Sequence, residues 1–362
     1  MKRENVTYDI VVVGAGPAGA NFARLCDSEK YKVLLIDGSE GREKVCGGLI
    51  SPDTQDILAR YGLSLPSEVL ASPQLFSVKT IDLSDGAIKY YRRNYINANR
   101  EELDRFFLSL VPDSVETVQG RCISIERMQD GFSVTLRENG AERQILCRYI
   151  VGADGAPSIV RRELFGAKRI YRYVAIQQWF EAGEVNPFYS CVFDNKTSSG
   201  CSWVFFKDGK MIFGGAFDPK GSRHAFEKQK KRLEELAVVP AGSFDRPLRT
   251  EACQVCRPKL SQGVFLGYNG AFLLGEAAGL ISPSSFEGIS YALLSSEYLA
   301  DAFNEPKNHQ KSDKIKRKYV KKTAKLRVKI AIKCLKRPFM YNQSLRRAVM
   351  RSGLSTIKVT QP

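Results

Sequence analysis

A glycine-rich turn near the start of the chain constrains the fold more than any other feature. Strand-like residues 8–13 run into Gly14-Ala15-Gly16-Pro17-Ala18-Gly19, and a helical stretch and a second apolar strand ending at Asp37 follow. In such a β-α-β unit the first glycine makes the tight turn, the second lets the backbone approach a pyrophosphate, and the third lets helix and strand pack closely. The carboxylate of Asp37 can accept from ribose hydroxyls. The pattern predicts a dinucleotide site.

Further pieces of a nucleotide-binding pattern are spread along the chain. Apolar strands run into two more glycine-rich turns, Gly152-Ala153-Asp154-Gly155 and Gly275-Glu276-Ala277-Ala278-Gly279, with strand-rich residues 170–217 between them. An NAD-dependent dehydrogenase normally completes its mononucleotide folds consecutively, whereas distant turns gathered around one ligand imply an elongated ligand. FAD fits this requirement, so we expect FAD as the cofactor.

The order of these segments predicts an α/β fold: a Rossmann-like FAD-binding domain with an inserted antiparallel β-sheet substrate domain and a helical C-terminus. We expect the FAD-binding domain from residues 1–75, 99–168 and 255–304, the β-rich domain from 76–98 and 169–254, and a basic helical segment from 305–362. A hairpin is predicted at 76–91, with its turn at Asp85-Gly86, and a three-stranded meander at 118–147.

The basic residues are concentrated at the C-terminus. The chain carries a net charge of +16, while residues 306–362 hold 18 Lys and Arg and one acid, so the remainder is nearly neutral. No nucleic-acid reading motif accompanies this charge, and we expect no nucleic-acid partner. The segment from Lys314 to Arg337 mixes apolar residues with lysines. It could lie on anionic lipid or be a solvated helical tail without a specific role, and both interpretations stay open.

The rest of the composition bears on where the protein works. The sequence contains no run of about 18 apolar residues, which a membrane span would need. Its first residues do not resemble a secretory signal. Nine cysteines, an odd number spread over a long chain, favour a reduced compartment. We therefore expect a cytoplasmic protein that is able to sit peripherally on the inner face of the membrane.

Over residues 6–300 these motifs resemble the p-hydroxybenzoate hydroxylase-type flavoprotein superfamily, whose FAD-binding domain is of the glutathione reductase type, and within it the geranylgeranyl reductase family. The resemblance implies that Arg100, in the R-x-x-L-D setting completed by Asp104, lies against the cofactor phosphates. It implies that Asp154 lies near FAD and any nicotinamide. Glu276 replaces the usual aspartate that binds the ribityl or ribose part of FAD.

Two motifs point to the reductase branch of this superfamily. Cys46-Gly47-Gly48 is similar to the motif that these reductases place beside the isoalloxazine and the substrate cavity. Cys201-Ser202-Trp203-Val204-Phe205-Phe206 is similar to their Y-x-W-x-F-P motif, although it departs from it at Cys201 and Phe206. The loop with Pro283, Gly288 and Ile289 resembles the one that passes the pyrimidine side of the flavin.

The expected site therefore has two parts and no metal. Cys46 and Trp203 are the candidates for the catalytic cavity. The candidates for cofactor binding are Gly14, Gly16, Pro17, Ala18, Gly19, Asp37, Gly38, Gly47, Gly48, Arg100, Cys122, Asp154, Gly155, Gly275, Glu276, Gly288 and Ile289.

The resemblance implies reduction of carbon–carbon double bonds in a polyprenyl lipid, with a hydride from reduced flavin and a proton from Cys46, a tyrosine or water. Aromatic residues are expected to line an apolar tunnel for such a chain: Trp179, Phe193, Trp203, Phe205 and Phe206. The electron donor is left open between NAD(P)H, ferredoxin and another electron-transfer protein.

Other interpretations of the same motifs stay open. The first is a flavin-dependent monooxygenase that acts on an aromatic or polyketide small molecule, and a flavin halogenase is a weaker one. The second is a flavin-binding membrane-associated protein without catalysis of its own. A separate pair, Cys253 and Cys256, is expected to be structural rather than a redox pair, and without a second pair it makes a poor zinc site.

Overall fold

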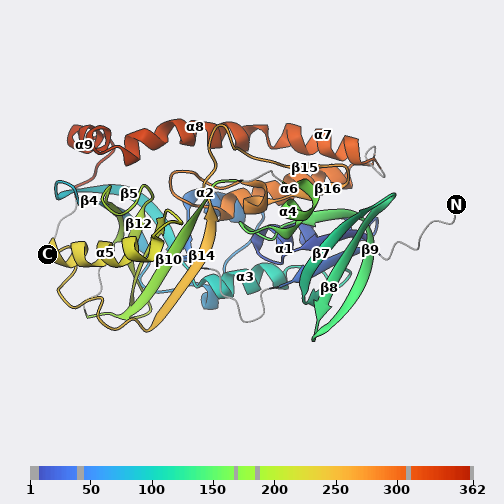
Figure 1. Cartoon of the computed structure of the whole chain (residues 1–362), viewed down its shortest axis with the longest axis horizontal. Helices are drawn as coiled ribbons and strands as arrows, with labels where there is room; N and C mark the ends of the chain where they lie inside the picture. The colour runs from blue at the N-terminus through green and yellow to red at the C-terminus, as the bar shows by residue number, and fades with distance from the viewer. Residues whose placement is uncertain (1–7, 39–44, 167–169, 184–187, 307–310, 359–362) are drawn as a thin grey trace.

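Two β-sheets of eight strands each stand side by side, and a row of C-terminal helices runs along both of them (Figure 1). The computed structural model describes residues 8–38, 45–166, 170–183, 188–306 and 311–358. The first sheet is largely parallel and carries the N-terminal glycine-rich turn, while the second is almost entirely antiparallel. This arrangement confirms the predicted fold class, including the helical C-terminus.

The first sheet is built around a buried parallel core with strand order β15-β16-β9-β1-β2-β6. Its strands are β1 (Tyr8–Val13), β2 (Val33–Asp37), β6 (Glu116–Gln119), β7 (Arg121–Met128), β8 (Gly131–Glu138), β9 (Ala141–Gly152), β15 (Gly267–Tyr268) and β16 (Ala271–Leu273). Residues Ile10 to Val12 and Leu34 to Leu35 are fully buried. Such continuous apolar runs are typical of strands that are covered on both faces.

Strand β9 joins two parts of the molecule that the sequence pattern separates. The predicted meander ends at residue 147 and a new strand follows, but the structure has one strand from Ala141 to Gly152. Its first half pairs antiparallel with β8, and its second half pairs parallel with β1, where Val13 lies opposite Gly152. The meander is therefore a continuation of the central sheet.

Helices around the first sheet hold the turns that follow its strands. They are α1 (Pro17–Leu25), α2 (Pro52–Arg60), α3 (Arg100–Ser109), α4 (Ile159–Phe165) and α6 (Ile289–Asn304), with short 3₁₀ turns η1 (Ser67–Val69) and η2 (Gly275–Ala278). The buried Asn21 amide on α1 donates to the carbonyl of Leu293 at 3.1 Å and to the hydroxyl of Ser296 at 2.7 Å, both on α6. This contact holds α1 and α6 side by side.

The second sheet has the strand order β14-β10-β13-β12-β11-β4-β5-β3, and its strands come from residues 49–97 and 172–256. They are β3 (Leu49–Ile50), β4 (Leu75–Asp82), β5 (Ala87–Asn97), β10 (Arg172–Glu181), β11 (Tyr189–Phe193), β12 (Ser202–Lys207), β13 (Lys210–Phe217) and β14 (Arg249–Cys256). Helix α5 (Ser222–Glu235) packs Phe226 against Phe213 and Phe217 of β13. The domain boundaries given above stay a prediction.

The basic C-terminus forms three helices, α7 (Ser312–Lys322), α8 (Ala324–Tyr341) and α9 (Gln343–Ser352). On α7, the hydroxyl of the buried Tyr319 donates to the carbonyl of Leu273 in the first sheet at 2.9 Å. On α9, the buried Arg346 forms an ion pair of 2.7 Å with Asp82 of β4 in the second sheet. The segment is thus packed on both sheets (Figure 1) rather than freely solvated.

Candidate functional site

A cavity of about 1210 Å³ is lined by residues of both sheets and of α8 and α9. All but three of the residues expected at the site line it, Cys46 and Trp203 included; the exceptions are Gly19, Gly48 and Gly275. Phe193 and Phe205 also line it, whereas Trp179 and Phe206, expected in the same tunnel, do not. Phe206 packs instead against the apolar cluster under α5, because successive side chains of a strand point to opposite faces.

The three exceptions are glycines at which the backbone packs closely against neighbouring atoms or adopts a positive φ angle. A Cβ added at Gly19 would lie 1.8 Å from the carbonyl oxygen of Gly14, and one at Gly48 would lie 1.9 Å from that of Ala98. Gly48 and Gly275 also have positive φ angles, +71° and +48°. Any other residue at these positions would displace the turns that form the wall.

The turn after β1 gives the cavity an anion-binding end. Gly14 has a φ of +103°, and a Cβ there would meet the carbonyl oxygen of Ala153 at 2.7 Å. Gly16 caps α1 without a side-chain hydrogen bond, and a Cβ at Gly16 would have no protein atom within 4 Å. The helix N-terminus therefore faces open space, where its free N–H groups and dipole favour a negative charge. The backbone around it belongs to Pro17 and Ala18, which also line the cavity.

Asp37 and Cys122 line the cavity beside this N-terminus of α1. Asp37, at the end of β2, is buried and lines the cavity with Gly38, and Cys122 at the start of β7 lies on the same wall. Burial raises the pKa of the Cys122 thiol to about 12, so the thiol stays protonated.

Asp154, in the turn after β9 and next to Gly155, has one carboxylate oxygen available for a ligand. Its Oδ2 accepts from the backbone N–H of Ile159 at 2.6 Å and of Val160 at 3.3 Å, at the start of α4. Its buried Oδ1 has no hydrogen-bond partner among the described residues. Burial raises the pKa of Asp154. A buried polar atom without a partner in the wall of a cavity indicates that a polar ligand completes it.

Arg100 contributes a positive charge, and its side chain is only 10% exposed. It opens α3, its Nε donates to Asp104 Oδ1 at 2.8 Å, and its guanidinium also interacts with the Cys46 thiol. Burial opposes the charged form, but the interactions with Asp104 and Cys46 together outweigh it, and the pKa of Arg100 is raised. The side chain is therefore a permanent cation in the wall, as phosphate binding requires.

Glu276 in η2 connects the two sheets. Its Oε1 accepts from the backbone N–H of Cys256, at the end of β14, at 2.7 Å, and the residue also lines the cavity. The residue that the resemblance assigns to the cofactor thus also anchors a strand of the second sheet. Gly288 and Ile289, at the start of α6, line the neighbouring wall.

The loop Cys46-Gly47-Gly48 is held in place by a lysine that the sequence analysis missed. Lys207 Nζ donates to the carbonyl oxygen of Gly47 at 2.9 Å and to that of Ala98 at 2.6 Å. Burial lowers the pKa of Lys207 to about 8. A signal was present in the sequence, because Trp203, Phe205 and Lys207 alternate along β12 and share one face.

Two aromatic residues lie against glycines in this part of the wall. A Cβ on Gly47 would lie 2.9 Å from the Phe205 ring, and one on Gly214 of β13 would lie 2.5 Å from the indole nitrogen of Trp203. The indole N–H donates to Gln177 Oε1 at 3.2 Å. Glycine at both positions is therefore required for the ring positions seen here.

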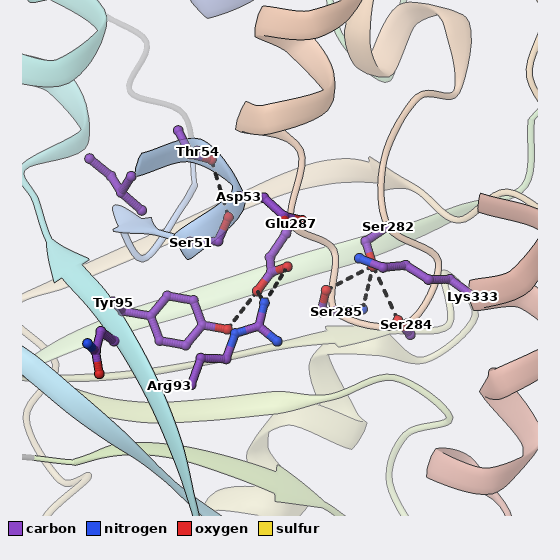
Figure 2. Close-up of polar contacts among 12 residues, drawn as sticks. Ser51, Asp53, Thr54, Arg93, Tyr95, Ser282, Ser284, Ser285, Glu287 and Lys333 are labelled. Atoms are coloured by element: carbon purple, nitrogen blue, oxygen red, sulfur yellow. Dashed lines mark hydrogen bonds and ion pairs between the residues drawn. The ribbon is translucent and has the colours of Figure 1, made fainter. Parts of the chain in front are cut away.

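Three polar residues that the sequence analysis missed, Arg93, Tyr95 and Glu287, join β5 to the loop before α6 (Figure 2). Arg93 Nη2 lies 3.0 and 3.2 Å from the two carboxylate oxygens of Glu287, and the Tyr95 hydroxyl donates to Glu287 Oε1 at 2.6 Å. All three residues line the cavity. Burial, together with the charge of Glu287, raises the pKa of Tyr95 strongly, so the phenol stays protonated.

The same loop is tied to the C-terminal helices. Lys333 of α8 donates to the hydroxyl of Ser282 at 3.3 Å, and Figure 2 shows this side chain reaching the serines of the loop. Tyr341, at the end of α8, donates to the carbonyl of Ser284. The position of α8 is thus coupled to one wall of the cavity.

Cysteines occur in and around the cavity without forming disulfides in the described chain. Cys191 and Cys201 line the cavity and their side chains interact with each other. Cys253 and Cys256 lie in one strand, β14, and no disulfide joins them. Within the described ranges, no cluster of three or more His, Cys, Asp or Glu side chains could hold a metal ion.

Comparison with known proteins agrees with this geometry. The family model described as "FAD binding domain" matches residues 7–331. Protein CbrA of Escherichia coli strain K12 is 41% identical over 356 residues, covering 97% of this chain and 98% of that protein. None of the helices in the described part of the chain combines the length and apolar character that a bilayer crossing requires.

Two solved structures have a similar overall shape. A geranylgeranyl bacteriochlorophyll reductase-like protein from Thermoplasma acidophilum superposes with a TM-score of 0.73 at 18% identity, covering 96% of this chain and 99% of the other. PqsL from Pseudomonas aeruginosa, in complex with 2-aminobenzoylacetate, superposes with a TM-score of 0.72 at 17% identity, covering 95% and 99%. Likeness at this identity is evidence for the fold alone.

Proposed function

The chain belongs to the FAD-binding domain family and is an FAD-dependent oxidoreductase, and on this premise we propose that it reduces carbon–carbon double bonds of a polyprenyl lipid, as geranylgeranyl reductases do. The observation that carries the proposal is the pairing of the Cys46-Gly47 backbone with Trp203 and Phe205 in one cavity. The backbone offers a flat surface for a flavin ring, and the aromatic residues offer an apolar surface for an alkene.

The residues present fit FAD. The N-terminus of α1 at Gly16 and the Arg100 guanidinium would hold the phosphates, and the carboxylate of Asp37 would accept from a ribose. The free Oδ1 of Asp154 would accept a further hydrogen bond from the cofactor. When bound and reduced, FAD supplies the hydride that an alkene reduction needs.

The chain itself would orient the substrate, exclude water and deliver a proton. Trp203, Phe205 and Phe193 give the cavity an aromatic wall on the second sheet, against which an apolar chain packs without losing hydrogen bonds. Excluding water from this wall keeps the reduced cofactor from side reactions.

For the proton, the proposal favours Cys46 over Tyr95. Burial and the neighbouring Glu287 raise the pKa of the phenol, which makes Tyr95 a poor acid. The Cys46 side chain interacts with the Arg100 guanidinium, and this cation would stabilise the thiolate that remains after proton transfer. Tyr95 would then act with Arg93 and Glu287 to hold the cavity wall.

A second candidate function is monooxygenation of a small aromatic molecule. It is favoured by the polar wall that Arg93, Glu287 and Tyr95 form in the cavity. A purely aliphatic chain could form neither hydrogen bonds nor ion pairs with this wall. Under the reductase proposal this wall would meet the polar head of the lipid.

One anaerobic experiment separates the two candidates. The purified yellow protein is reduced with dithionite, mixed with geranylgeranyl-bearing lipids in detergent, and followed by flavin absorbance and product mass. Reoxidation with a gain of about two mass units per reduced bond, from one hydride and one proton, supports the reductase. A flavin that stays reduced until oxygen enters, and then hydroxylates an aromatic compound, supports the monooxygenase.

A further inference from the structure

Helix α8 carries a stripe of large apolar side chains that face solvent. Val328, Ile332, Leu335 and Phe339, here called the outer stripe, have 58%, 47%, 61% and 53% of their surface exposed. Their spacing of four, three and four residues places them on one face of the helix. In Figure 1 the C-terminal helices form the outermost layer on their side of the molecule.

Folding does not require the outer stripe, because the opposite face of α8 already packs on the body of the protein. Leu326 and Ile330 are 5% and 4% exposed and belong to the core of the first sheet. The apolar residues of the segment from Lys314 to Arg337 therefore divide between two faces. Val320, Leu326 and Ile330 pack inward, while Val328, Ile332 and Leu335 point outward.

Lysines flank the outer stripe. A shallow groove on α8 is lined by Ala324, Val328 and Ile332 together with Lys325, Lys329, Lys333 and Lys336. Lys329 forms an ion pair with Asp53 and Lys333 reaches Ser282, so Lys325 and Lys336 are the lysines assigned to a surface. An apolar stripe bordered by such cations is complementary to the interface of an anionic bilayer, where the apolar side chains enter the acyl boundary and the lysines meet the headgroups. A nucleic acid would use the charges but would leave the stripe in water.

The outer stripe is continuous with the cavity. Phe339 at its end also lines the cavity, as does Val349 of α9, which is 40% exposed. Met340, Arg346 and Met350 line the same part of the wall. A molecule resting on the stripe therefore lies next to residues of α8 and α9 that line the cavity.

We propose that the outer faces of α8 and α9 dock on an anionic lipid bilayer, so that the cavity opens toward the membrane between Phe339 and Val349. This proposal rests on the proposed function insofar as the substrate is a lipid, but the docking itself is measured without turnover. It adds to that function the surface and the route by which the substrate is collected.

The test is flotation of the full-length holoenzyme with vesicles of phosphatidylcholine alone or mixed with phosphatidylglycerol. The variant Ile332→Ser/Leu335→Ser removes the centre of the stripe and leaves the cavity residues intact. The matched control, Leu236→Ser/Leu248→Ser, changes two leucines that are 48% and 52% exposed, at the end of α5 and before β14. FAD content is measured in every variant to verify folding.

We expect the unmodified protein and the control variant to bind the mixed vesicles, and to bind vesicles of phosphatidylcholine alone at least tenfold more weakly. The stripe variant should bind the mixed vesicles at least tenfold more weakly than the unmodified protein does. Lys325→Glu/Lys336→Glu should also lose binding to the mixed vesicles. Unchanged binding of the stripe variant, or equal binding to both kinds of vesicle, would overturn the proposal. Activity on detergent-dispersed lipid is assayed separately: vesicle binding without any lipid reduction would refute the proposed substrate and leave the docking surface standing.

Discussion

The ammonium of Lys207 donates a hydrogen bond to the carbonyl oxygen of Gly47 over 2.9 Å, between residues 160 positions apart in the chain. The contact joins β12, which carries Trp203, to the loop that carries Cys46. It therefore sets the spacing between the two motifs that the sequence analysis named for the catalytic cavity.

Replacing Lys207 with methionine should loosen this loop. The carbonyl oxygens of Gly47 and Ala98 would lose their buried partner, which costs about 1–3 kcal/mol of the free energy of unfolding. We expect lower thermal stability and a slower reductive step, measured by calorimetry and by single-turnover absorbance. Lys210→Met, at an exposed ion pair with Glu181, is the control and should change stability by less than about 1 kcal/mol. Equal effects of the two changes would argue against the role of Lys207.

The pH dependence of stability should reveal the same lysine. Burial lowers the pKa of Lys207 from 10.5 to about 8 in the folded protein, so the unfolded chain binds the proton more tightly. Between these two pH values the contribution of Lys207 to the free energy of unfolding should rise with pH, by up to about 3 kcal/mol, and below the window it should be flat. Urea unfolding of the unmodified protein and of Lys207→Met across this range measures the difference, and a constant difference would contradict the shifted pKa.

Gly16→Ala should weaken FAD binding without weakening the fold. A Cβ at Gly16 meets no protein atom within 4 Å but enters the cavity at the N-terminus of α1, where the pyrophosphate is expected. We expect at least tenfold weaker FAD binding in a fluorescence titration of the apoprotein, with the melting temperature of the apoprotein unchanged. Gly183→Ala, where an added Cβ meets no atom of the described residues within 4 Å, should bind FAD normally. If both variants keep full FAD affinity, the cofactor does not pass close to Gly16.

Cys46→Ala tests the proton step of the proposed reaction. Loss of a positioned acid typically lowers the rate about 100-fold or more, while FAD content and substrate binding should remain. The measurement is the rate of flavin reoxidation by lipid under anaerobic conditions, compared with Tyr95→Phe. The assignment fails if the tyrosine variant loses the rate and the cysteine variant keeps it.

Glu287→Gln should open the wall between β5 and the start of α6. It removes the carboxylate that Arg93 and Tyr95 share, so the buried Tyr95 phenol and the partly exposed Arg93 guanidinium both lose a charged partner. A loss of about 1–2 kcal/mol in stability is expected, because the buried phenol loses a charged acceptor while the ion pair with the partly exposed arginine contributes less than about 1 kcal/mol. Denaturant unfolding measures this loss. Glu181→Gln, at the exposed ion pair with Lys210, should cost less than about 1 kcal/mol, and a similar loss in both variants would show that Glu287 has no special role.

Which glycine-rich turns and which acids line one cavity could largely be predicted from sequence, because the turns are built locally; their role in cofactor binding stays a prediction. The turn at Gly14 to Gly19, the acid at Asp37 and the turn at Asp154 each place their groups by the geometry of one strand and the loop that follows it. The same reasoning predicted the fold class, because β-α-β periodicity and glycine position are properties of short segments. It misplaced the end of the meander, since whether β9 stops at Cys147 or continues to Gly152 depends on pairing with β1.

Only the tertiary structure decided which distant side chains meet. Lys207 reaches Gly47, and Tyr95 reaches Glu287, which is 192 positions away in the chain. These contacts form because both sheets contribute residues to the wall of one cavity. It also decided which apolar residues of the C-terminus belong to the core: Ile330 and Ile332 look alike in the sequence, yet one is buried and the other is exposed. Local patterns determine the type of an element and its turn chemistry; the packing of elements far apart in the chain determines which face is buried and which groups share a site.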